Sequence, residues 1–219
     1  MIHPSGVGLV LACLLTSSCV QAPTVRSELR EGLPKGATSE PVVHLLPESR
    51  GGQDRIGTRF PAVEFDAWWS DEAHGGSHIT GTVTLYRWWT DGCRFCETSL
   101  PAIETLRRKY ADRGLTAVAV YHPKSRQPLT DDAIRDGARA RGFLGFVAED
   151  RDWSELRRSY LDWGERRATS VTIIVDRDGV VRFVHPGPEF YPSEAHGSVL
   201  ANSDFEAVDR ALEALLDSR

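Results

Sequence analysis

Cysteine is scarce in this sequence, whose 219 residues include only Cys13, Cys19, Cys93 and Cys96. Cys93 and Cys96 form one Cys-x-x-Cys pair, and the second pair that a four-cysteine zinc site needs is missing. A scaffold of several disulfides, common in small exported domains, is excluded as well. Half of a zinc site and a purely structural disulfide remain as alternatives to redox chemistry for the pair.

Excess positive charge and long apolar runs are also missing. The 26 Lys and Arg residues stand against 31 Asp and Glu, and both signs are spread along the chain. A basic surface that would bind nucleic acid is therefore not expected. The apolar run at residues 7–15 is too short to span a bilayer. With 41% apolar residues, the chain still has ample material for one packed domain with extensions.

The beginning of the chain has the pattern of an export signal. Residues 7–15 form an apolar core, and small residues follow in the sequence Thr-Ser-Ser-Cys that ends at Cys19. A cysteine at this boundary resembles the lipobox of bacterial lipoproteins, in which that cysteine becomes the lipidated first residue. The resemblance implies a signal peptide at 1–18, lipidation of Cys19 and an extracytoplasmic protein anchored to a membrane. Ordinary secretion with cleavage nearby and a retained anchor are the alternatives.

The remainder of the chain predicts a tether followed by an α/β domain. Residues 19–57 are rich in Pro, Gly, Ser and charges, and a short apolar run at 42–46 predicts a small edge strand. From residue 58 to 219, apolar runs predict buried strands and helical spacing predicts helices. The expected strands are 82–88, 115–121, 143–148, 170–176 and 180–184, and the expected helices are 97–112, 131–141, 152–161 and one around 205–216.

The chain is organised around the segment from Trp88 to Cys96, which reads Trp-Trp-Thr-Asp-Gly-Cys-Arg-Phe-Cys. The apolar strand before this segment and the helical spacing after it place Cys93 at the first turn of a helix. Unpaired N–H groups and the positive end of the helix dipole favour a thiolate at that place. Cys96 lies one turn away on the same face, close enough for a disulfide. Cys-x-x-Cys between a strand and a helix is the thioredoxin-like redox signal.

These residues resemble the thioredoxin-like family of membrane-tethered, extracytoplasmic thiol–disulfide oxidoreductases of the TlpA/ResA type. Trp89, Cys93, Cys96 and Pro101 fall in register with the family motif, and the resemblance covers about residues 60–217. It implies one thioredoxin-like domain with a central mixed sheet flanked by helices. It also implies disulfide exchange with exported protein thiols and with a partner redox protein, by a monomer that needs no metal or other cofactor.

The helix start makes Cys93 the expected attacking thiolate, and Cys96 the residue that resolves the mixed disulfide. The positive charge of Arg94 should add to the helix dipole in favouring the thiolate. His122 follows the strand 115–121 at the sheet edge where Cys93 emerges, and a buried structural histidine is the alternative for it. The residues expected in the substrate groove or directly behind the cysteines are Trp89, Arg94, His122 and Ser170.

Three positions depart from the family pattern. Ser170 stands where the family has a cis-proline opposite the cysteines. Because a cis bond before a non-proline costs about 2.5–4 kcal/mol, we expect a trans bond there. Arg87, six residues before Cys93, replaces a common Asp or Asn and cannot act as a base, so it should pair with an acid or point outward. Phe95 replaces the frequent proline before Cys96, and little follows from that.

Two other functions remain open from the sequence. Thr90 and Cys93 form the Thr-x-x-Cys of peroxiredoxins, although Tyr86 and Ser170 stand where that family has a Pro and an Arg. Two arginines close to the latter place are Arg166 and Arg167. A thiol peroxidase that uses Cys93 is therefore one alternative. A redox-inactive binding module on the same fold is the other.

Overall fold

The structure is a computed structural model that describes residues 51–70, 81–164, 166, 168–193 and 197–218. All of these belong to the second of two units into which the chain divides, Glu40–Arg219. The elements and residues of the sequence analysis that lie outside the described ranges are the signal peptide, Cys19, the edge strand at 42–46 and Arg167. No helix within the described ranges is long and apolar enough to cross a membrane.

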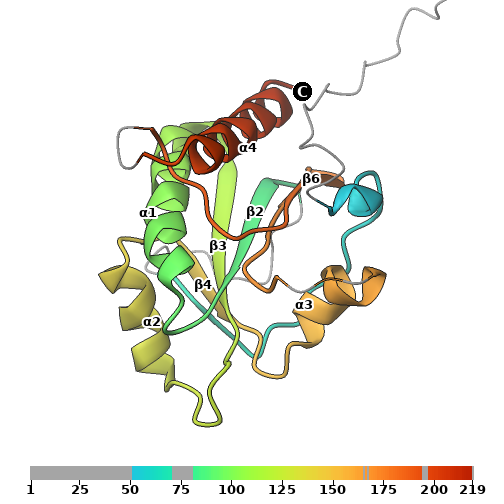
Figure 1. Ribbon diagram of the computed structural model, residues 1–219. Coiled ribbons are helices and arrows are strands. Elements are labelled where there is room, and N and C mark those ends of the chain that lie inside the picture. The colour runs from blue at the N-terminus through green and yellow to red at the C-terminus, as the bar shows by residue number, and fades with distance from the viewer. Residues whose placement is uncertain (1–50, 71–80, 165, 167, 194–196, 219) are drawn as a thin grey trace, which may run out of the picture. The chain divides into compact units, whose positions relative to one another are not determined.

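The described strands form one mixed sheet in the order β1-β4-β3-β2-β5-β6 (Figure 1). β2, β3 and β4 run parallel to one another. β1 pairs antiparallel with β4 at one edge, and β5 and β6 are added antiparallel beside β2. The strands are β1 (Ala67–Trp69), β2 (Val83–Trp89), β3 (Leu115–Tyr121), β4 (Phe146–Glu149), β5 (Thr172–Val175) and β6 (Val181–His185). The predicted central mixed sheet is therefore confirmed.

Helices cover both faces of this sheet (Figure 1). Leu100 of α1 and Leu212 of α4 share a hydrophobic core with Leu85 of β2. Leu156 of α3 shares a second core with Tyr86 of the same strand. The helices are α1 (Arg94–Lys109), α2 (Asp131–Ala140), α3 (Ser154–Ser159) and α4 (Val199–Asp217), and the 3₁₀ turns are η2 (Gln53–Arg55), η3 (Ala111–Arg113) and η4 (Leu161–Trp163).

β2 lies inside the sheet and is buried on both faces along its whole length. Because successive side chains of a strand point to opposite faces, its two tryptophans separate. Trp89 joins the core beneath α1, whereas Trp88 joins the core beneath α3, and both are 0% exposed. The cysteine segment thus begins from the fully buried end of a central strand.

Residues 52–57, which the sequence analysis places in the tether, pack against the domain. The backbone N–H of Gly57 donates to the carbonyl of Val181 at 2.8 Å. The Nε of Arg55 donates to the carbonyl of Ser159 at 2.9 Å, and Arg55 is 1% exposed. A Cβ on Gly52 would lie only 2.6 Å from a methyl of Val184, so this segment approaches β6 closely. The segment therefore contacts both β6 and the end of α3.

Candidate active site

The two cysteines lie where β2 passes into α1. β2 ends at Trp89, a short turn follows in which Gly92 has a φ of +64°, and Cys93 is the N-cap of α1. Cys93 and Cys96 form a disulfide, and their Cα atoms are 5.3 Å apart. The backbone N–H of Cys96 donates to the carbonyl of Cys93 at 2.9 Å. The sequence prediction that the spacing brings both sulfurs together at a helix start agrees with this geometry.

The two sulfurs differ in their access to solvent. Cys93 is half-buried, whereas Cys96 is 0% exposed and belongs to the core beneath α1. A substrate disulfide can therefore reach only the Cys93 sulfur directly. Reduction would leave the Cys93 thiolate beside the free N–H groups and the positive dipole end of α1, which stabilise negative charge.

Ser170 lies against both sulfurs. Its Oγ is 3.7 Å from the Sγ of Cys93 and 3.7 Å from the Sγ of Cys96. Among the described residues the cis peptide bond is Gly187–Pro188, so the bond before Ser170 is trans, as the sequence predicted. A Cβ on Gly187 would lie 2.8 Å from the carbonyl oxygen of Ser170, so glycine allows the loop after β6 to cover this position.

Arg87 lies behind the disulfide and is 0% exposed, so neither arrangement expected from the sequence is found. Its guanidinium donates to three neutral oxygens, one each from Thr172, Ser99 and Pro188, at 3.2, 2.9 and 2.6 Å. Burial lowers the pKa of Arg87 to about 9, and Glu189 acts in the opposite direction. The side chain thus stays protonated at neutral pH, and it links β5, α1 and the loop after β6.

His122 is buried at the end of β3. Its backbone N–H donates to the carbonyl of Trp89 at 3.0 Å, and its ring packs edge-on against Trp153 at 4.7 Å. Burial, helped by the nearby Lys124, lowers the pKa of His122 to about 3. The ring is therefore neutral at ordinary pH and supplies no positive charge near the cysteines.

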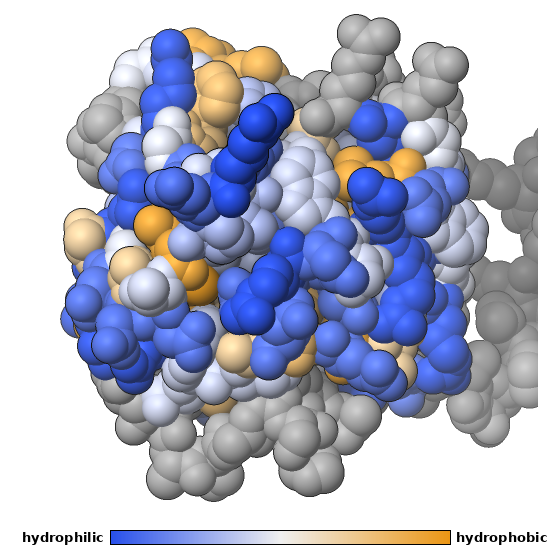
Figure 2. Space-filling view, turned by 90° about the horizontal axis from the view of Figure 1, so that it is seen from below, coloured by the Kyte–Doolittle hydropathy of each residue, from blue (hydrophilic) through white to orange (hydrophobic). Residues whose placement is uncertain are grey.

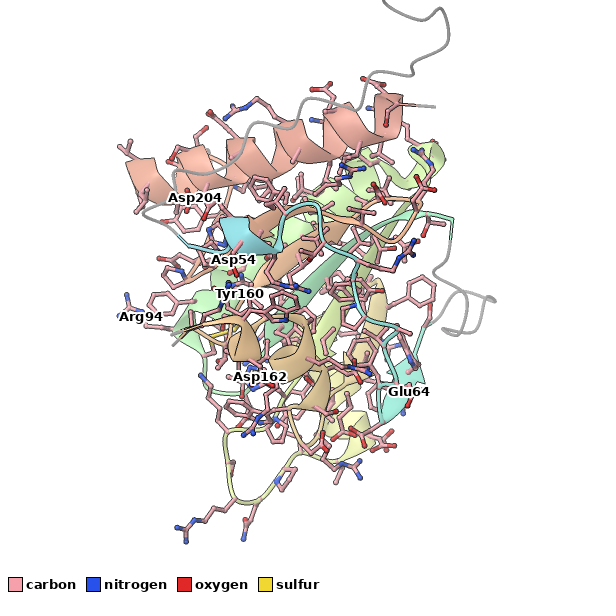
Figure 3. The ribbon with its side chains drawn as sticks, turned by 90° about the vertical axis from the view of Figure 1, so that its right-hand side faces the viewer. Asp54, Glu64, Arg94, Tyr160, Asp162 and Asp204 are labelled. Atoms are coloured by element: carbon pink, nitrogen blue, oxygen red, sulfur yellow. A yellow bond between two sulfur atoms is a disulfide. The ribbon has the colours of Figure 1, made fainter. Side chains whose placement is uncertain are left out.

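Trp89 and Arg94 differ in their exposure to solvent. Trp89 is 0% exposed and packs against Tyr121 at 5.1 Å, so it can affect the cysteines only through packing. Arg94 is exposed at the start of α1 and lies over the ring of Phe95 at 5.0 Å. Its side chain extends away from the body of the domain (Figure 3). Of these two residues, only Arg94 is available to a docking partner.

The residues that suggested a peroxidase have other partners. The hydroxyl of Thr90 donates to Asp91 at 3.3 Å. The guanidinium of Arg166 forms an ion pair with Asp54 and lies over the ring of Tyr160 at 4.4 Å. Within the described residues, no hydrogen bond joins Thr90 or Arg166 to Cys93. This structure therefore offers the peroxidase alternative no supporting contact.

Within the described part of the chain, the surroundings of the disulfide offer no metal-binding cluster. Among the described residues, no group of three or more His, Cys, Asp and Glu side chains is placed to hold a metal ion.

Figure 2 shows the side of the molecule to which β2 and β3 run. Hydrophilic residues predominate on it, and hydrophobic residues are scattered rather than gathered in one broad patch. A partner that docks here would meet a mainly polar surface.

The residues around Arg87 were not anticipated from the sequence. Ser99 lies three residues after Cys96 on the same helix, and that spacing could have placed it near the cysteines. Thr172 is the cross-strand neighbour of Arg87 in the β2–β5 register. Recognising that pairing requires the sheet topology. No local pattern points to the carbonyl of Pro188.

The fold and the site together define a thioredoxin-like protein with a Cys-x-x-Cys disulfide. The solution structure of a thioredoxin-like protein in the oxidised form is similar, with 21% identity, a TM-score of 0.53, and coverage of 74% of this chain and 97% of that one. The thioredoxin domain of a thiol-disulfide oxidoreductase from Bacteroides vulgatus has 16% identity, a TM-score of 0.48, and coverage of 70% and 96%. StoA from Bacillus subtilis has 18% identity, a TM-score of 0.45, and coverage of 68% and 99%.

Comparison at the level of sequence adds nothing to this. No family model matches the chain, and no curated protein matches it. The similarity to solved structures confirms the predicted thioredoxin-like fold.

Proposed function

We propose that this protein is a thiol–disulfide oxidoreductase that exchanges disulfides with protein partners through Cys93 and Cys96. The observation that supports the proposal is the unequal burial of the two bonded sulfurs at the start of α1. Cys93 is half-buried and Cys96 is 0% exposed. One sulfur is thus available to a partner, and the other is held where it can attack only its neighbour.

The exchange proceeds in two steps when the protein acts as the reductant. The Cys93 thiolate attacks one sulfur of a substrate disulfide, which forms a mixed disulfide and releases the other substrate sulfur as a thiolate. Cys96, after losing its proton, then attacks the Cys93 sulfur, and the substrate leaves with its second thiolate. The substrate gains two electrons, and the protein is left with the Cys93–Cys96 disulfide. The same steps in reverse oxidise a dithiol substrate.

Trapping tests this assignment directly. A Cys96→Ser variant should accumulate mixed disulfides with protein partners, because nothing remains to resolve them, whereas Cys93→Ser should accumulate none. Non-reducing electrophoresis with mass spectrometry would detect the adducts. Adducts on Cys93→Ser but not on Cys96→Ser would exchange the two roles, and none on either variant would remove the proposal.

The proposed setting is the extracytoplasmic side of a membrane, to which a lipid on Cys19 anchors the domain. The support comes from the apolar run at 7–15 and the small residues before Cys19. Residues between Cys19 and the packed segment that begins at Gly52 would then serve as the tether. In this setting the monomeric domain would exchange electrons with a partner redox protein and with exported thiol proteins.

A further inference from the structure

A cavity of about 420 Å³ lies beside the cysteine site, between η2 and the end of α3. Its wall includes Asp54, Tyr160, Trp163, Arg166, Ala168 and Gly187. Figure 3 labels Asp54 and Tyr160, which lie next to each other on the side of the domain that faces the viewer. Nothing in the proposed exchange chemistry requires this cavity.

The cavity wall contains a buried arginine with unused hydrogen-bond donors. The side chain of Arg166 is 9% exposed. One terminal nitrogen pairs with Asp54 and also lies 3.5 Å from the carbonyl of Trp163, but Nε and the other terminal nitrogen have no hydrogen-bond partner among the described residues. Buried donors of a charged group without acceptors are costly, so they mark a place for an acceptor.

A second buried guanidinium backs the same wall. Arg55 is 1% exposed and stacks on the ring of Trp163 at 3.5 Å. Its Nε donates to the carbonyl of Ser159, whereas both terminal nitrogens lack a partner among the described residues. Burial lowers the pKa of Arg55, the carboxylate of Asp54 acts in the opposite direction, and the positive charge of Arg166 lowers it further.

The charges that the described residues bring to this cluster do not balance. Arg55 and Arg166 contribute two positive charges, and Asp54 is the acidic side chain among the described residues that lines the cavity. Asp54 is 50% exposed, so solvent screens part of its charge. One further negative group would complete the set. A carboxylate fits because its two oxygens can accept from the parallel N–H groups of a guanidinium.

The cavity adjoins the residue that touches both sulfurs. Ala168 and Gly187 line the cavity. A Cβ on Gly187 would lie 2.8 Å from the carbonyl oxygen of Ser170 and 3.6 Å from the Cβ of Ala168. The Oγ of Ser170 is 3.7 Å from the sulfur of Cys93. Ser170 thus lies between the Cys93 sulfur and Gly187 of the cavity wall, and a peptide bound at Cys93 would reach the cavity past this residue.

We propose that this cavity, with Arg166 as its principal donor, is a subsite that binds a carboxylate of the disulfide substrate. The inference rests on the proposed exchange function and gives it a substrate preference for acidic peptides. Arg166 acts here as a positioning residue that holds the substrate beside Cys93. Arg55 strengthens the positive potential from behind Trp163.

Three peptides with the same internal disulfide test the subsite against the reduced full chain. The first carries Gln and a C-terminal amide, the second carries Glu and the amide, and the third carries Gln and a free C-terminal carboxylate. The wild type should exchange about tenfold faster with at least one acidic peptide than with the neutral one, as a charge-assisted hydrogen bond would give. Comparison of the second and third peptides shows whether a side chain or a chain end supplies the carboxylate.

Two variants and one control complete the experiment. Arg166→Met should bring the acidic-to-neutral rate ratio close to one, and Asp54→Asn should raise it because a competing carboxylate is removed. The control Arg113→Met, which loses a comparable ion pair with Asp217, should keep the wild-type ratio.

Equal rates of the wild type on all three peptides would overturn the subsite and leave the exchange function intact. An unchanged ratio in both Arg166→Met and Asp54→Asn would overturn it as well. Reaction with none of the peptides would instead count against the exchange function.

Discussion

At the scale of single residues, Ser170 gives this site a polar contact at the position where the TlpA/ResA-type family, which the sequence resembles, has a proline. In the disulfide, neither sulfur carries a hydrogen, so the Ser170 hydroxyl is the donor, and its single hydrogen can point to either sulfur. After reduction, the same hydroxyl can donate to the Cys93 thiolate. A donor to an anion stabilises the reduced form and makes the disulfide a stronger oxidant.

Ser170→Ala removes that donor while leaving the backbone unchanged. With a loss of about 1 kcal/mol, the Cys93 pKa should rise by about 0.7 and the reduction potential should fall by about 20 mV. The pH dependence of alkylation and equilibration with a glutathione buffer measure the two quantities. Ser203→Ala on the exposed side of α4 is the control. Identical values in wild type and Ser170→Ala would show that the hydroxyl does not act on the thiolate.

His122 makes a residue-scale prediction about pH and stability. In the unfolded chain this imidazole takes up a proton near pH 6.5, but in the folded protein its pKa is lowered to about 3. As the pH falls through that window the unfolded state binds more protons, so His122 reduces stability by about 1.4 kcal/mol per pH unit.

His122→Phe keeps a ring against Trp153 but cannot titrate. Between pH 7 and pH 5, wild type should lose about 2 kcal/mol more unfolding free energy than the variant. Urea denaturation at the two pH values measures this difference. Parallel pH dependences would mean that the folded protein protonates His122 as readily as the unfolded chain does.

The sequence predicted the chemistry-bearing residues of the site better than their surroundings. Local spacing was enough to bring Cys93 and Cys96 together, and the family pattern placed Ser170 opposite them. The acceptors of Arg87 could not be predicted, because they come from a neighbouring strand, a helix and a loop. The ion pair of Arg166 and Asp54 spans 112 residues of sequence, beyond any local pattern.

At the scale of elements, α3 depends on one buried carboxylate. Asp150 follows β4 and accepts the backbone N–H groups of Glu155 and Leu156 at 3.0 and 2.8 Å. It also accepts the indole N–H of Trp88 at 3.1 Å. The helix is only six residues long, so its own hydrogen bonds contribute little, and this cap fixes it to the sheet.

Asp150→Ala leaves three buried donors without an acceptor and should cost about 3 kcal/mol of unfolding free energy. Asp152→Ala is the matched control, because its exposed carboxylate accepts the N–H of Ser154 at 3.0 Å and its loss should cost no more than about 1 kcal/mol. Denaturation midpoints of both variants provide the comparison. Equal losses in the two variants would show that burial of this cap is unimportant.

Within the described residues, the predicted strands and helices were found near their expected positions, but β1 was not predicted and several element limits were wrong. The strand expected at 143–148 begins only at Phe146, because Phe143 closes the turn after α2 by donating its N–H to Ala138 at 3.0 Å. α4 begins at Val199 rather than near Phe205. The apolar residues that begin it, Val199 and Leu200, are 83% and 59% exposed, so they do not follow the helical periodicity of the buried face.

At the scale of the whole molecule, the anchoring prediction concerns residues that precede the packed domain. If Cys19 is lipidated, the full chain should partition into the detergent phase, and Cys19→Ser should move it to the aqueous phase. Cys13→Ser is the control, since Cys13 lies within the predicted signal. A wild-type protein that is already aqueous, or whose mature form begins at another residue, would contradict lipidation at Cys19.

The burial of Arg87 has a consequence for heat resistance. Its guanidinium is enclosed with neutral acceptors only, a poorly compensated arrangement for a charge. Reduction of the disulfide frees the Cys93 thiolate at the start of α1, the helix that carries Ser99, and this negative charge adds to that of Glu189 in offsetting the guanidinium. A thermodynamic cycle requires that whatever stabilises the reduced fold over the oxidised fold also makes the disulfide more oxidising.

The difference in melting temperature between the reduced and oxidised proteins, measured by calorimetry, should therefore change together with the reduction potential. In Arg87→Met, the melting temperature of the reduced protein relative to that of the oxidised protein should fall compared with wild type, and the reduction potential should fall with it. The same comparison in Arg113→Met should show neither change. If Arg87→Met shifts both melting temperatures equally, the guanidinium is only a structural link, and heat cannot distinguish the two redox states through it.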